Sequence, residues 1–160
     1  MILGMKGGDE MCKNYKKEYE AMCWETKRYQ KKYDLVYQWM KLKQNHIELI
    51  EFFQERNISS LAVYGIGDLG RLICKEPGIN EIIKYGIDRR GEIELEGLSI
   101  YTLESIKHDV DAILITPVLI TDEIEDRIYD VLGEQNTFVL EEVLFELSRK
   151  YGIESGLWPI

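Results

Sequence analysis

The sequence predicts an α/β fold in which a long helical arm precedes a three-layer domain with a five-stranded parallel sheet in the order 3-2-1-4-5. Three observations predict this fold. From residue 58 onward, short apolar runs alternate with helical segments, a pattern typical of strands joined by right-handed crossovers. Before residue 58, apolar and aromatic residues recur at helical spacing. The chain has 160 residues, 45% of them hydrophobic, which suits one domain with an appended element.

The arm is predicted over residues 10–56, after a flexible N-terminus at 1–9. Its seam alternates spacings of four and three residues: Tyr15, Tyr19, Met22, Thr26, Tyr29, Tyr33, Val36, Met40, Lys43, Ile47 and Ile50. A straight helix of this length would measure about 70 Å, too long to bury the stripe on its own domain. We expect the arm to form a homo-oligomer as a coiled coil. An intramolecular hairpin that turns near 41–45, or a helix lying on an anionic membrane, would be the alternatives.

Charge divides the chain at the same place. Residues 13–43 carry nine Lys or Arg against four Asp or Glu, whereas residues 58–150 carry nine against nineteen, and the whole chain has a net charge of -9. This acidic surface argues against nucleic acid as a partner.

Three widely spaced cysteines suit neither a disulfide framework nor a zinc site, and no apolar stretch reaches the length of a membrane span. We therefore expect a cytoplasmic protein without a metal.

The domain is predicted over residues 58–152 and a C-terminal tail over 153–160, with Trp158 as its docking anchor. A helix within 46–56 ends near Asn57 and leads into the first strand. The expected strands are 61–65, 82–88, 98–101, 112–116 and 137–140. The expected helices are 68–76, 103–107, 122–132 and 141–151, with Thr102 and Thr121 as caps and Gly133 and Gly152 as stops.

A glycine-rich turn joins the first strand to the next helix, with the sequence G-I-G-D-L-G from Gly65 to Gly70. Gly65 permits the tight turn, Gly67 lets the backbone approach a pyrophosphate, and Gly70 lets the helix pack closely on the strand. An acidic residue, Asp88, ends the second strand and would accept hydrogen bonds from a ribose diol. Together these features predict a nucleotide site.

With these motifs, residues 58–150 resemble the Rossmann-like NAD(P)-binding superfamily. The glycine turn, the G-I-D ending at Asp88 and the segment LEGLSIYTLE at 95–104 look most like small Rossmann domains of bacterial cell-surface polysaccharide and nucleotide-sugar pathways. The resemblance implies NAD, NADP or a nucleotide sugar as the ligand. The positions that it implies for the site are Gly65, Ile66, Gly67, Asp68, Leu69, Gly70, Asp88, Arg89, Thr116 and Pro117.

Some residues depart from this pattern. The carboxylate of Asp68 would repel a pyrophosphate nearby. Arg89 and Arg90 would tolerate a 2'-phosphate that Asp88 disfavours, so both NAD and NADP remain open. Neither the two histidines nor Cys74 has the partners needed for metal binding or nucleophilic catalysis.

The function that we expect is nucleotide binding in a regulatory, sensory or scaffolding role. There are two alternatives: a nucleotide-sugar-modifying or redox enzyme subunit completed by a partner, and an interaction module with a non-functional nucleotide site.

Overall fold

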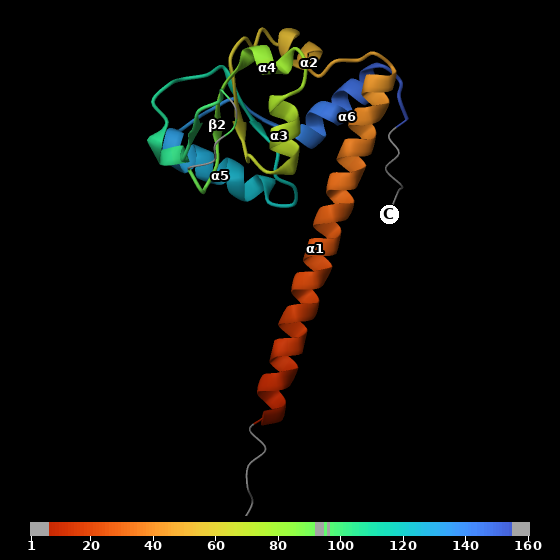
Figure 1. Cartoon of the computed structure of the whole chain (residues 1–160), viewed down its shortest axis with the longest axis vertical. Coiled ribbons are helices and arrows are strands. Elements are labelled where there is room, and N and C mark those ends of the chain that lie inside the picture. The colour runs from red at the N-terminus through yellow and green to blue at the C-terminus, as the bar shows by residue number, and fades with distance from the viewer. Residues whose placement is uncertain (1–6, 92–94, 96, 155–160) are drawn as a thin grey trace, which may run out of the picture.

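The computed structural model describes residues 7–91, 95 and 97–154, and its overall course is shown in Figure 1. A five-stranded, all-parallel sheet has the order β3-β2-β1-β4-β5, and a long N-terminal helix precedes it. The predicted fold class is thereby confirmed. The anchor role expected of Trp158 lies outside the described residues. No helix in the described part of the chain is both long enough and apolar enough to cross a membrane.

All five predicted strands are present and lie within the predicted ranges. Their bounds are β1 Leu61–Tyr64, β2 Ile83–Ile87, β3 Ile100–Tyr101, β4 Ala112–Ile115 and β5 Thr137–Val139. Strand β1 occupies the centre, hydrogen-bonded to β2 on one side and β4 on the other. Both β1 and β4 are buried along their whole length, as expected for strands covered on both faces.

The helices that join the strands differ more from the prediction. They are α3 Asp68–Cys74, α4 Ile79–Ile82, η1 Leu103–Ser105, α5 Thr121–Leu132 and α6 Leu140–Lys150. The α4 turn was not predicted, because its apolar residues continue directly into β2 and periodicity cannot divide so short a run. The helix expected over 103–107 is a single 3-10 turn.

Two apolar clusters on opposite faces of the sheet give the domain three layers. In β1, Leu61 and Val63 join one cluster while Ala62 and Tyr64 join the other, which is the alternation of a strand. The first cluster includes side chains of the long helix, α3 and α6, and the second includes those of α5 and η1. The arm therefore belongs to one of the two helical layers.

Most of the predicted arm is one helix, α1, which spans Gly7–Gln44 and is about 57 Å long at 1.5 Å per residue. From here on, the arm means this helix. It begins inside the segment predicted to be flexible and ends inside the predicted arm. The chain then turns through His46, which has a positive φ of 58°, and continues into the short helix α2, Ile50–Gln54. Residues 10–56 thus form two helices, and the break lies at the place where the sequence allowed a turn.

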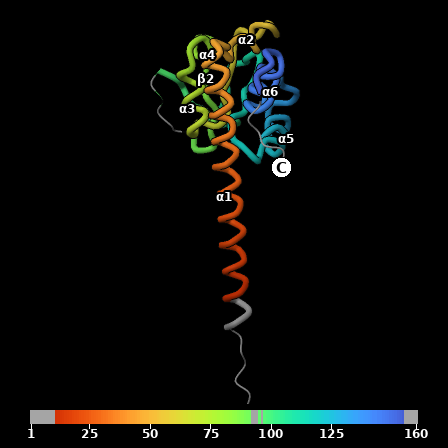
Figure 2. Tube along the Cα trace, turned by 90° about the vertical axis from the view of Figure 1, so that its right-hand side faces the viewer, coloured from red at the N-terminus to blue at the C-terminus, as the bar shows by residue number. Residues whose placement is uncertain are grey.

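The second half of α1 is part of the domain core. Leu35, Trp39 and Leu42 are buried, and Gln38 Nε2 donates a buried hydrogen bond of 2.7 Å to Ser148 Oγ on α6. The first half runs away from the domain, as Figures 1 and 2 show from two directions. The end of the arm nearest the domain is thus core of its own chain, but through these residues and not through the tyrosine-rich face that an intramolecular hairpin would bury.

The seam predicted from the sequence lies on a different face of α1 from the one that packs on the domain. Its six large side chains before Lys43 remain 54–69% exposed: Tyr15, Tyr19, Met22, Tyr29, Tyr33 and Met40. Helix α1 consequently has two apolar stripes, and its own domain covers only one of them.

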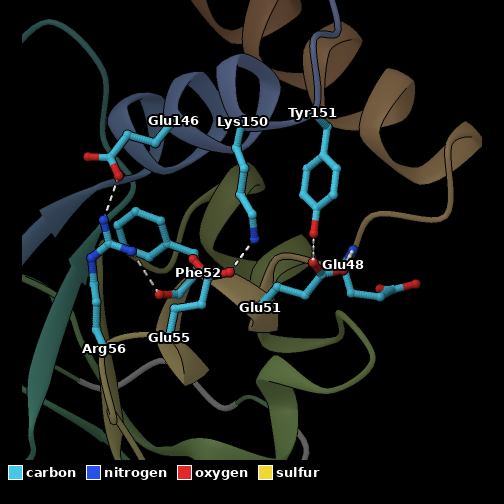
Figure 3. A network of polar contacts seen from close by, with 8 residues as sticks. All are labelled: Glu48, Glu51, Phe52, Glu55, Arg56, Glu146, Lys150 and Tyr151. Carbon is cyan, nitrogen blue, oxygen red and sulfur yellow. Dashed lines mark hydrogen bonds and ion pairs between the residues drawn. The ribbon is translucent and has the colours of Figure 1, made fainter.

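Helix α2 is fastened to α6 by a set of polar contacts (Figure 3). Arg56 lies 3.6 Å from the centroid of the Phe52 ring and donates to Glu146 Oε2 at 2.5 Å. Lys150 donates to Glu55, and the Tyr151 hydroxyl donates to Glu51. These contacts hold the connection between α1 and β1 in place, and so stabilise the position of α1 on the sheet.

Leu42→Ala should lower the free energy of unfolding by roughly 2–5 kcal/mol, because it removes a fully buried side chain from the core. Lys17→Ala, at an exposed position in the first half of the same helix, should change it by less than about 0.5 kcal/mol. Urea denaturation measures both. Equal, small effects would mean that α1 is not part of the core.

A carboxylate at the start of β4 fixes the loop that enters β1. Asp111 Oδ2 accepts hydrogen bonds from the amides of Ser59 (2.8 Å) and Ser60 (2.9 Å) and from the Ser59 hydroxyl (2.9 Å). These bonds, the Ser59 amide first, lower the pKa of Asp111 from 3.8 to about 2. Because the folded state prefers the ionised form, this contribution to stability is complete above the unfolded pKa and is lost as the pH falls toward 2.

Asp111→Asn should therefore lower the melting temperature at pH 7 and weaken its dependence on pH between about 4 and 2. Thermal melts followed by circular dichroism across this range provide the measurement. A variant whose pH dependence matches that of the original chain would show that these bonds do not favour the ionised carboxylate.

Candidate functional site

The turn between β1 and α3 contains three glycines, of which two are sterically required and one borders open space. Gly65 has a φ of 88°, and a Cβ added there would lie 2.5 Å from Pro117 Cγ. A Cβ at Gly70 would lie 1.9 Å from the carbonyl oxygen of Gly65. Both positions require glycine for the turn to close. Gly67 differs, because no described atom lies within 4 Å of a Cβ built there. Its backbone borders open space.

Asp88, at the end of β2, holds the turn from the side. Its Oδ2 accepts a hydrogen bond of 3.0 Å from the amide of Ile66, and its Oδ1 accepts bonds from the amide (3.0 Å) and Nε (3.2 Å) of Arg90. Burial alone would raise the pKa of Asp88, but these hydrogen bonds together lower it. At neutral pH the carboxylate is therefore ionised and already accepts three hydrogen bonds from its own chain, which the ribose-binding role predicted from the sequence did not include.

Thr116 and Pro117 brace the turn from β4. The buried Thr116 hydroxyl donates to the carbonyl oxygen of Gly65 at 2.7 Å and lies 3.1 Å from that of Tyr64. The Pro117 ring occupies the space that a side chain at Gly65 would need. The carboxyl ends of β1, β2 and β4 are thus tied together around one loop.

A cleft of about 420 Å³ opens above this turn, at the carboxyl edge of the sheet. Eight of the ten predicted site residues line it: Gly65, Gly67, Asp68, Leu69, Asp88, Arg89, Thr116 and Pro117. Ile66 is fully buried in the core, and Gly70 is buried where α3 meets the turn. Both act on the shape of the turn from beneath the cleft.

One wall of the cleft comes from the arm, which the sequence did not predict. Trp24, Arg28 and Lys32 line it, and their spacing of four residues places them on one side of α1 over about 12 Å. The Arg28 guanidinium carbon lies 5.5 Å from the Trp24 ring centroid, and Trp24 remains 46% exposed. The arm thus brings an aromatic surface and two cations to the cleft.

Asp68 is paired with the arm. Its Oδ2 accepts a hydrogen bond of 3.0 Å from Lys32 Nζ, and this bond, with smaller contributions from Arg28 and Arg71, lowers the pKa of the Asp68 carboxyl. Lys32 therefore offsets the repulsion that Asp68 would exert on a phosphate. The ion pair also links α1 to α3 across the cleft.

The cleft is cationic although the chain is acidic. Its lining carries four cationic side chains, Arg28, Lys32, Arg89 and Arg90, against the two carboxylates of Asp68 and Asp88. The whole chain has a net charge of -9. A concentration of positive charge in one concave place of an acidic protein favours an anionic ligand there.

A second cavity of about 230 Å³ lies beside the first and shares the loop that follows β4. Lys31 and Glu141, which form an ion pair, line it together with Asp122 and Glu123. Leu119 in this loop has a positive φ of 67°, uncommon for leucine. This cavity is more acidic than the cleft, because three carboxylates and one lysine line it.

In the described part of the chain, neither a metal cluster nor an activated thiol is found. Burial raises the pKa of the Cys74 thiol to about 11, which leaves it protonated near neutral pH. Within the described residues, no three or more His, Cys, Asp or Glu side chains are grouped to hold a metal ion.

Comparison with known proteins assigns neither a family nor a function to the chain. A scan against models of protein families gives no match, and a search of curated proteins finds no similar sequence.

Proposed function

We propose that the chain binds a nucleotide that contains a diphosphate, NAD(H), NADP(H) or a nucleotide sugar, in the cleft between α1 and the glycine turn. The observation that carries this proposal is the backbone of Gly67, which borders open space within a cleft lined by four cations. Free approach to a glycine backbone together with positive charge is what a diphosphate requires.

The role proposed for the bound nucleotide is regulatory, sensory or scaffolding, in a cytoplasmic protein of polysaccharide metabolism. The cleft supports this role because its polar groups are suited to holding an anion, and Asp88 and Thr116 are engaged in supporting the turn. The metabolic setting rests on the resemblance of residues 58–150 alone. In this proposal the chain works as a homo-oligomer joined through α1.

Two other functions compete with this one. An enzyme subunit could obtain its reacting groups from a partner bound at the rim of the cleft. Alternatively, the cleft could be a remnant in a protein that serves only for interaction. Binding measurements with NAD, NADP and UDP-sugars separate the second possibility from the proposal, because it predicts that none of them binds.

Gly67→Ala should weaken binding of the nucleotide at least tenfold, equivalent to about 1.4 kcal/mol, because its methyl group would occupy the space that the diphosphate needs. Calorimetry measures the affinity. The melting temperature should stay within about 2 °C of the original, since no described atom contacts the added group. Gly70→Ala is the contrasting variant and should destabilise the fold, because its Cβ would overlap the carbonyl of Gly65. Unchanged affinity in Gly67→Ala would place the ligand elsewhere.

Asp68→Asn should tighten binding by about three- to tenfold, because it removes a negative charge near the phosphates and releases Lys32 to contact them. The gain should shrink as salt is added. Asp130→Asn is a matched control, since it changes the net charge equally at an exposed position outside the cleft lining. An equal gain in both variants would show that the effect comes from the net charge of the chain and not from the position of Asp68.

A further inference from the structure

We propose that the exposed seam of α1 pairs, in parallel and in register, with the same seam of a second copy of the chain. Val36 packs partly against the domain core, and the rest of the predicted stripe between residues 15 and 40 is left uncovered. We call these uncovered residues the exposed seam: Tyr15, Tyr19, Met22, Thr26, Tyr29, Tyr33 and Met40. The same spacing continues backward to Cys12. This inference rests on the homo-oligomer in the proposed function and gives that oligomer a surface, a stoichiometry and an orientation. It does not depend on the ligand of the cleft.

The anchored half of α1 determines which way the seam points. Leu35, Trp39 and Leu42 are held in the domain core, and Gln38 is bonded to Ser148. The helix cannot rotate to bury the seam without removing these side chains from the core. The seam therefore needs a cover from outside the chain.

The first half of α1 has a particular need for a partner. It extends beyond the domain in both views (Figures 1 and 2), and Tyr15, Tyr19 and Met22 are each more than 60% exposed. In proteins, most of the stability of a helix comes from the packing of an amphipathic face, and this half has no such packing on its own domain. Since buried aromatic side chains each cover about 150–250 Å², pairing two seams would remove on the order of 1,000 Å² from water, the scale of a specific interface.

The charges beside the seam suit a second copy. The charged residues beside the seam are Lys16, Glu18 and Glu25, with Lys32 already paired to Asp68 of its own chain, so neither sign accumulates along the seam. The other cations of the free half lie farther around the helix: Lys13, Lys17, Lys27 and Arg28. An anionic membrane would repel the carboxylates of Glu18 and Glu25, which lie beside the stripe.

The repeat favours parallel pairing. Cys12, Tyr19, Thr26, Tyr33 and Met40 are each seven residues apart, so parallel, in-register helices place each of them opposite its own copy. The rings of Tyr19 and Tyr33 then contact the same rings of the second copy, and the two Thr26 side chains face each other. In an antiparallel pair that keeps the seam residues of both helices in contact, Cys12 would lie opposite Lys43. Lys43 is bonded to Glu48 (2.5 Å) and Glu76 (2.8 Å) in its own chain.

The test begins with the mass of the full chain in solution. Sedimentation equilibrium should give a dimer for the original chain and for Ala21→Glu, whose added charge lies off the seam. Met22→Glu, with the same charge one residue later and in the seam, should be a monomer. Neither side chain packs in the domain, so circular dichroism should show that both variants keep their sheet. A monomeric original chain, or a dimer that Met22→Glu leaves intact, would overturn the proposal.

Orientation is tested through Cys12 in the full chain carrying Cys23→Ser. Mild oxidation should produce a disulfide-linked dimer for the parallel arrangement, and Cys12→Ser should abolish it. A dimer by mass that does not cross-link through Cys12 would refute parallel pairing. Calorimetry with NAD and UDP-sugars on Met22→Glu examines the cleft separately, so loss of the dimer and loss of the nucleotide site are distinguishable.

Discussion

The burial of one stripe of α1 in the domain core is the constraint on which the remaining features depend. Leu35, Trp39 and Leu42 enter the same apolar cluster as β1 and α6, and this fixes the rotation of a helix that extends well beyond the domain. Once that rotation is fixed, Trp24 and Arg28 border the cleft and the tyrosines face solvent. A single packing interaction thereby turns one side of the arm toward the cleft and leaves its tyrosine-rich side uncovered by the domain.

The cleft concentrates positive charge in a protein that is acidic as a whole. Each carboxylate near the glycine turn has a donor: Asp88 has the amide of Ile66 and Arg90, and Asp68 has Lys32. Such pairs in a concave place reduce the repulsion that the carboxylates would exert on a phosphate, while Arg28 and Arg89 add positive charge. The arm is the source of half of these cations, so the cleft depends on both parts of the chain.

The sequence was sufficient for the sheet but not for the arm's place on it. Local apolar runs predict the parallel strands. The glycine turn is recognisable from the sequence because Gly65 and Gly70, where a side chain would overlap neighbouring atoms, lie within one short segment. The contacts of Trp24 and Lys32 with the cleft depend on how α1 docks, which no local pattern encodes. Periodicity found the tyrosine seam, but the stripe that is actually buried includes Gln38, a polar residue whose partner Ser148 is 110 residues away.

The central claim is that the arm and the glycine turn form one ligand site. Hydrogen exchange with and without NAD or UDP-glucose tests it most directly, because the two segments are far apart in sequence. The account predicts that the nucleotide slows exchange in residues 24–32 and 65–70 together, with little change in 140–150. Slowing in the glycine turn alone, or in neither segment, would contradict it.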